Sequence, residues 1–168
     1  VTARGRRGRY LQECLELRAP PDVWFLADPA STAAGLRACL LPRTPSVGSV
    51  CRVLEHTCWI SSIDVGYNNL KAHGTKALLD ALLRSANPLA SLDLAGNAIL
   101  HAACEGGFAD PPGGSSALCT MRVRSSILEC LDCLLCSRTT LTRLGLSDND
   151  LGDMGLAAVA RAAQGACV

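Results

Sequence analysis

Three evenly spaced cysteines are the first residues whose types and positions could support chemistry. Two residues separate each of Cys130, Cys133 and Cys136 from the next, and three thiolates so spaced can ligate an iron–sulfur cluster. A ferredoxin-like run needs a fourth cysteine followed by proline, but Thr140 stands where the fourth would fall. The surrounding leucines and isoleucine indicate a helix, on which the three sulfurs do not converge. We therefore interpret these residues as buried structural cysteines and expect no metal.

Histidines and carboxylates provide no better catalytic group. His56, His73 and His101 have no cysteine or carboxylate partner at ligand spacing. Asp64 and Asp93 each lie between two apolar residues and are expected to stand side by side, an arrangement that can be catalytic. Carboxylates on a solvated face are more often only solvated. With no nucleophile elbow or phosphate-binding loop in the sequence, we expect a protein that is not an enzyme, without catalytic residues or a cofactor.

The elements that must position these residues belong to a repeat that occurs three times. Each copy fits L-x-x-L-x-L-x-x-N-x-L, with leucine, isoleucine or valine at the L positions. The matching residues are Ile60, Ile63, Val65, Asn68 and Leu70 in the first copy, Leu89, Leu92, Leu94, Asn97 and Ile99 in the second, and Leu141, Leu144, Leu146, Asn149 and Leu151 in the third. The alternating apolar residues indicate a short strand with one buried face. The asparagine amide can satisfy backbone groups where the strand ends and the chain turns, so these asparagines are structural.

A helix is expected between successive strands. Helical spacing of apolar residues predicts helices over 47–56, 74–83, near 125–137 and over 153–163. The residues expected to face inward are Ala77, Leu78, Ala81 and Leu82 in the second of these helices, and Leu156, Val159 and Ala160 in the last.

The length of the repeat and its glycines indicate a family. Ile60 and Leu89 are 29 residues apart, and Gly74 and Gly155 each lie four residues after the last apolar position of their repeats. This unit resembles the leucine-rich repeat of the ribonuclease-inhibitor class, also found in NOD-like receptors and Ran GTPase-activating proteins. The resemblance covers residues 47–168. It implies an α/β fold, a right-handed solenoid with parallel strands on its concave face and helices on its convex face.

Residues 1–45 fit the repeat poorly. We predict a basic tail followed by a degenerate repeat or N-terminal cap, and a leucine-rich-repeat domain over 46–168. Residues 14–17 are interpreted as a degenerate strand with Leu15 and Leu17 inward, and residues 33–41 as its helix; the alternative is an irregular lid. The run from Arg4 to Arg9 is interpreted as a solvated tail, and its alternative is a contact with nucleic acid or an acidic protein.

The second repeat contains an insertion. Leu89 and Leu141 are 52 residues apart, and the excess falls at about 104–120, where glycine and proline pairs interrupt the chain. We interpret the insertion as a tolerated surface loop, because the entropic cost of a loop grows slowly with its length. A contact loop specific to this protein is the alternative.

Composition narrows the class of protein further. Apolar residues make up 49% of the chain and aromatic residues only 4%, which suits thin repeated layers. The formal net charge of +1 gives no overall argument for nucleic acid or membrane binding. The ten cysteines include Cys51 within an apolar helical stretch, where it is expected to be buried and free. Together with the absence of a signal-type segment, these features predict an intracellular, cytoplasmic protein, with a cytoskeletal or organellar complex as the alternative.

The concave face of such a solenoid is its expected contact surface. Tyr67 and Arg143 are of the residue types that anchor interfaces. The outward residues expected to bind a partner are Ser62, Asp64, Tyr67, Ser91, Asp93, Arg143, Ser147 and Asp148. No polar cap follows the last repeat, so we expect that end to continue in a longer chain or to dock against another subunit.

These features predict a protein–protein interaction module. The leading hypothesis is a scaffold or assembly subunit of a larger intracellular complex. The alternatives are a regulatory module, either a GTPase activator or an enzyme inhibitor, and the sensor tail of a NOD-like receptor.

Overall fold

The computed structural model describes residues 3–16, 18, 33–35, 44–100, 115–137 and 140–165. In chain order its elements are α1 (Ala3–Glu16), β1 (Ala33–Gly35), α3 (Thr44–Glu55), β2 (Ser62–Asp64), α4 (Lys71–Arg84), β3 (Ser91–Asp93), α5 (Ser115–Ser137), β4 (Arg143–Gly145) and α6 (Gly152–Gly165). From β1 onward, strands and helices alternate. No helix in the described ranges is both long enough and apolar enough to cross a membrane.

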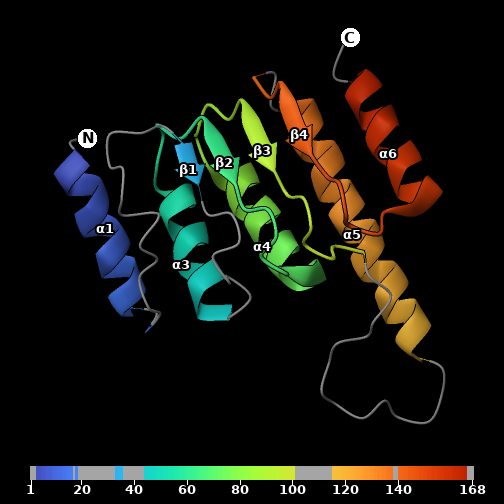
Figure 1. The fold of residues 1–168 in the computed structure, drawn as a ribbon, viewed down its shortest axis with the longest axis horizontal. Coiled ribbons are helices and arrows are strands. Elements are labelled where there is room, and N and C mark those ends of the chain that lie inside the picture. The colour runs from blue at the N-terminus through green and yellow to red at the C-terminus, as the bar shows by residue number, and fades with distance from the viewer. Residues whose placement is uncertain are drawn as a thin grey trace.

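The strands form one parallel sheet in the order β1-β2-β3-β4 (Figure 1). Its register aligns Ile63 of β2 with Leu92 of β3, and Leu92 with Leu144 of β4. These three residues hold the same position in the predicted repeats, so the alignment of the repeats is confirmed. β1 extends the sheet by pairing Ala34 with Ile63.

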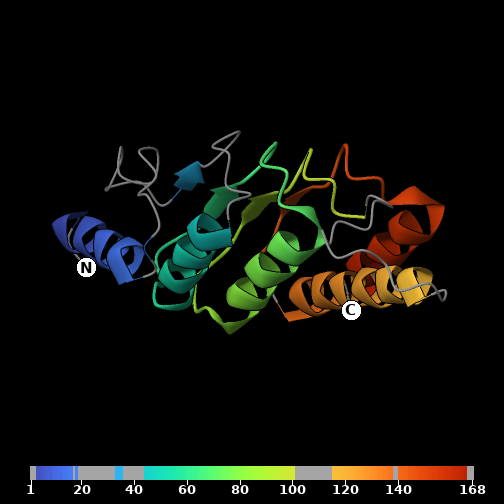
Figure 2. The same cartoon turned by 90° about the horizontal axis from the view of Figure 1, so that it is seen from below.

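Alternation along the strands buries one face of the sheet. Ile63 and Val65 are each 1% exposed, and Leu92 is fully buried. Asp64 and Asp93, which lie between such residues, are partly exposed. The helices that follow the strands lie along the buried face (Figure 2). The opposite face, which the described helices leave uncovered, is called the open sheet face below.

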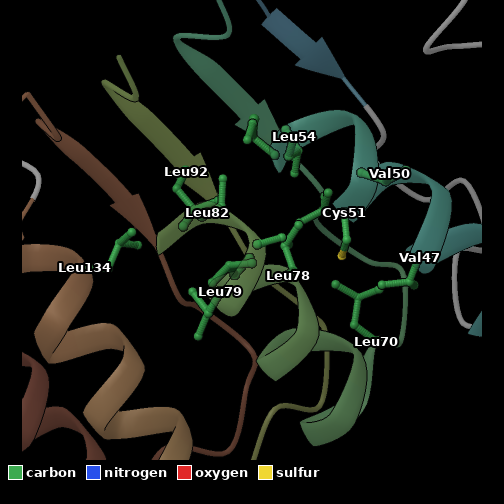
Figure 3. Close-up of a cluster of buried hydrophobic side chains, with 14 of the residues drawn as sticks. Val47, Val50, Cys51, Leu54, Leu70, Leu78, Leu79, Leu82, Leu92 and Leu134 are labelled. Carbon is green, nitrogen blue, oxygen red and sulfur yellow. The ribbon is translucent and has the colours of Figure 1, made fainter. Parts of the chain in front are cut away.

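Aliphatic side chains from neighbouring elements fill the core. Leu54 of α3 is fully buried, and so is Leu134 of α5. In α4, Leu78 points toward α3 while Leu79 points toward α5, so this helix contributes to the core on both sides (Figure 3). The predicted helix over 47–56 is confirmed as α3. Packing of this kind needs no aromatic centre, in keeping with the low aromatic content.

The local elements that we predicted within residues 1–45 are wrong where the structure describes them, whereas the degenerate repeat or N-terminal cap stays a prediction. The arginine-rich run lies in helix α1 instead of a tail, and Cys14 and Leu15 lie in the same helix instead of a strand. Cys14 is 2% exposed and Leu15 is 77% exposed, because helical period turns one residue toward α3 and the next away from it. Ala33–Gly35 is strand β1, where we expected a helix. Leu17 and residues 36–41 lie outside the described residues.

Two of the predicted helix faces need correction. Ala77 is exposed on α4, and Leu156 and Ala160 are exposed on α6. The repeat makes Leu156 equivalent to Thr75 and Ala160 equivalent to Leu79; both α4 residues are fully buried. Since Leu79 points toward α5, the exposed face of α6 corresponds to the face of α4 that the next helix covers. Apolar spacing located the face correctly but did not show whether another helix covers it.

Helix α5 also differs from its prediction. It begins at Ser115, ten residues before the expected start, so the last residues of the predicted insertion are helical. The rest of that insertion lies outside the described residues. Cys130 is partly exposed, and Cys133 and Cys136 are exposed, so our interpretation of them as buried is wrong. Among the described side chains of α5, the buried ones are the aliphatic residues Ile127, Leu131 and Leu134.

Cys51 is buried, as predicted, and its burial makes the stability of the fold depend on pH in the alkaline range. Burial, and next the charge of Glu55, raise the pKa of the Cys51 thiol from 9.0 to about 12. Above pH 9 the unfolded chain loses this proton while the folded chain keeps it. The free energy of unfolding is therefore expected to fall by about 1.4 kcal/mol per pH unit between those pKa values.

Urea denaturation between pH 8 and 11 tests this expectation. Cys51→Val should show a shallower loss of stability above pH 9 than the wild-type protein. Cys133→Val, which removes an exposed thiol, serves as the matched control and should keep the wild-type slope. Equal slopes for the wild type and Cys51→Val would show that Cys51 is not the responsible group.

Candidate functional site

The open sheet face brings most of the predicted partner-binding residues together. The register places Ser62, Ser91 and Arg143 in one row across β2, β3 and β4. The next row contains Asp64 and Asp93, with Gly145 at the equivalent position of β4. The serines and aspartates are partly exposed, and Arg143 is exposed. A strip of short side chains therefore ends at the exposed guanidinium of Arg143.

The two aspartates have a structural role in their own repeats. Asp64 Oδ1 accepts a hydrogen bond from the Gly66 amide at 3.0 Å, and Asp93 Oδ1 accepts one from the Ala95 amide at 2.9 Å. Each carboxylate thus holds the turn that follows its strand. A Cβ at Gly145 would lie 2.5 Å from Asp93 Oδ1, so the third repeat accommodates the neighbouring carboxylate by having no side chain there.

Tyr67 links the first repeat to the third across the second. Its hydroxyl donates to Asp148 Oδ2 at 3.1 Å. Tyr67, Gly96 and Asp148 hold equivalent positions, and all three have positive φ angles of 58°, 64° and 56°. The Tyr67 ring lies over Gly96, where a Cβ would come within 2.5 Å of Tyr67 Cδ1. The sequence predicted Tyr67 and Asp148 as surface residues; it did not show this contact or the need for glycine between them.

Replacing Gly96 by alanine is expected to break this link. The new Cβ must displace the Tyr67 ring, and alanine must also adopt a positive φ, so we expect the free energy of unfolding to fall by about 2 kcal/mol. Gly152→Ala is the matched control, because Gly152 has a φ of 62° but nothing lies within 4 Å of its Cβ position. Urea denaturation of both variants separates the two effects. Equal losses would contradict a role for the ring contact.

The structural asparagines connect successive repeats through the backbone. Asn68, Asn97 and Asn149 are at most 2% exposed. Asn97 Oδ1 accepts from the amides of Asn68 and Leu70 in the preceding repeat, and Asn149 Oδ1 accepts from the Asn97 amide. The predicted role is confirmed for these contacts, and the structure adds that each bond reaches across to the neighbouring repeat.

Asn87 is a further structural residue that sequence reasoning missed. It is 1% exposed. Its Oδ1 accepts from the Ile60 amide and the Thr57 hydroxyl, each at 3.1 Å, and its Nδ2 donates to the Leu54 carbonyl at 2.8 Å. The residues at its position in the other two repeats are different, Cys58 and Thr139. The repeat pattern therefore carried no signal for Asn87.

The helical side of the sheet carries a separate polar cluster. Lys76 Nζ lies 2.7 Å from Asp80 Oδ2, and the Cys130 thiol donates to Asp80 Oδ1 at 3.4 Å. Burial raises the pKa of the Cys130 thiol, and its hydrogen bond to Asp80 raises it further. A protonated thiol is a poor nucleophile and a poor metal ligand. Within the described ranges, no group of three or more His, Cys, Asp or Glu residues is placed to hold a metal ion.

Comparison with known proteins gives one result. Residues 138–160 match a family model described as a leucine-rich repeat. The match spans β4 and α6 as far as Ala160, and it supports a leucine-rich-repeat protein. No curated protein and no solved structure shows a significant match to the chain.

Proposed function

We propose that the leucine-rich repeat at residues 138–160 is one of three in this chain, and that they build a right-handed solenoid of the ribonuclease-inhibitor class. The parallel register supports this proposal, because it pairs equivalent residues of the three repeats. Gly74 and Gly155 support it as well. Their amides donate to the Leu70 and Leu151 carbonyls at 3.1 and 3.2 Å. The first turns of α4 and α6 therefore contain the same backbone hydrogen bond.

The proposed function is to bind another protein through the open sheet face, as a scaffold or assembly subunit of a larger intracellular complex. The observation that carries it is the Tyr67–Asp148 hydrogen bond, which holds the ring of Tyr67, a residue that is 48% exposed, over Gly96. A ring fixed before binding loses little conformational entropy when a partner docks. The short side chains of Ser62 and Ser91 would let the partner approach the sheet closely.

Binding without catalysis is part of the same proposal. On the open sheet face, Asp64 and Asp93 each accept a backbone hydrogen bond in a turn. On the helical side, the raised pKa of Cys130 keeps its thiol protonated. These contacts support structural roles for the groups that would be the first candidates for an acid, a base or a nucleophile.

Affinity purification of the tagged protein, followed by mass spectrometry, tests this function. We expect one stable multi-subunit assembly, and we expect Tyr67→Ala combined with Arg143→Ala to reduce its capture about tenfold. Arg122→Ala combined with Asp132→Ala, on exposed positions of α5, is the matched control and should capture normally. Equal capture by both double variants would overturn binding through the open sheet face. Capture of a single small GTPase or nuclease would favour a regulatory module instead.

A further inference from the structure

The large exposed apolar side chains of the described residues lie on the open sheet face and on two helices. They are Leu11, Leu15, Tyr67, Met154 and Leu156. Tyr67 is held by Asp148 on the open sheet face. The other four lie on α1 and α6, the helices at opposite ends of the row (Figure 1). The molecule thus presents one apolar patch at each end.

The patch on α1 is a narrow stripe with a basic end. Arg7, Leu11 and Leu15 follow one another at intervals of four residues, which places them on one side of the helix. Arg7 is exposed, and Leu11 and Leu15 are 44% and 77% exposed. Cys14, three residues after Leu11, lies beside this stripe and is buried. Four of the six residues from Arg4 to Arg9 are arginines, so positive charge gathers at the beginning of this helix.

The patch on α6 is a stripe of matching length with an acidic end. Leu156, Ala160 and Ala163 are exposed at helical spacing, and Asp153 precedes them in the first turn. Asp148 and Asp150 are exposed just before the helix. The positions of α4 that are equivalent to Leu156, Ala160 and Ala163 are occupied by Thr75, Leu79 and Leu82. All three of these α4 residues are buried. The repeat therefore shapes this side of α6 to receive another helix.

We propose that the α1 stripe of one molecule packs against the α6 stripe of a second copy. With the two helices parallel, Arg7 meets Asp153, Leu11 meets Leu156, and the large Leu15 meets the small Ala160. Large side chains opposite small ones allow the ridges of one helix to enter the grooves of the other. The opposite charges at the starts of the helices add attraction that depends on salt.

The same charges disfavour parallel symmetric pairing. Parallel pairing of α1 with α1 would bring the arginine-rich starts of two helices together, and parallel pairing of α6 with α6 would bring together both copies of Asp153. The two surfaces in the proposed contact are different. A chain of copies therefore keeps one unoccupied α1 stripe at one end and one unoccupied α6 stripe at the other, however many copies are added. Such association gives open chains that lengthen with concentration.

Two variants that each block one stripe test the proposal. Leu15→Asp blocks α1 and Leu156→Asp blocks α6, and both positions are exposed enough for the variants to fold. Sedimentation velocity over roughly a hundredfold range of concentration should show wild-type species growing beyond a dimer. Each variant alone should remain monomeric, whereas their equimolar mixture should form a dimer and nothing larger. Ala77→Asp, on the exposed side of α4, is the control and should associate like the wild type.

The other outcomes are equally decisive. Wild-type protein that stays monomeric throughout, or a mixture that stays monomeric while the wild type associates, would overturn the proposal. Dimers of Leu15→Asp alone would indicate pairing of α6 with α6. A charge reversal provides an independent test: Arg7→Asp and Asp153→Arg should each weaken self-association about fivefold. Mixing these two charge variants should restore it, and failure to restore it would contradict the proposed alignment.

Discussion

Replacement of Asn97 by alanine is expected to lower the free energy of unfolding by about 3 to 5 kcal/mol. The side chain is fully buried, and it serves two repeats. Its Oδ1 accepts from the amides of Asn68 and Leu70 at 3.2 and 3.1 Å. Its Nδ2 donates to the carbonyls of Val65, Leu94 and Ala95. Alanine would remove the hydrogen bonds that Asn97 makes to these backbone amides and carbonyls, which water does not reach.

Two measurements check this expectation. Urea denaturation gives the loss of stability, with Ser147→Ala on the exposed surface as a control that should change it by less than about 0.5 kcal/mol. Hydrogen exchange is more specific, because the amides of Asn68 and Leu70 should exchange faster in the variant. A loss of stability no larger than that of the control, with unchanged exchange, would show that Asn97 does not connect the repeats.

Replacement of Leu92 by alanine is expected to cost about 3 to 4 kcal/mol, because it removes a side chain that is fully buried in the middle of the sheet. The equivalent residue of the next repeat, Leu144, is only partly buried on the last strand of the sheet order. The same substitution there should cost about half as much, since the exposed part of the side chain contributes little to stability.

Comparing the two leucine variants tests whether the loss of stability depends on burial, because the residue type is the same at both positions. Both changes remove the same atoms from the same repeat position, and urea denaturation of dilute protein measures each. Dilution keeps the protein monomeric, so the proposed self-association through α1 and α6 does not add to the measured stability. Equal losses at both positions in dilute protein would contradict the difference in burial between β3 and β4.

The sequence alone determined the repeat and most of what depends on it. The spacing of apolar residues predicted β2, β3 and β4, their mutual register and the inward position of Ile63. It also predicted the structural role of the three asparagines at the turns. These features follow from local periodicity and from the need to pair backbone groups at each turn, and both can be read from a segment on its own.

The tertiary structure decided what each surface meets. Leu79 and Ala160 hold the same repeat position, yet one is buried by α5 and the other is exposed. The arginine-rich segment lies in α1, where Cys14 joins the hydrophobic core, and the repeat pattern did not indicate this helix. Tyr67 reaches Asp148 only because Gly96 lies between them in space. Periodicity specifies which face of an element can be buried, but burial also needs a neighbour, and only the assembled chain supplies it.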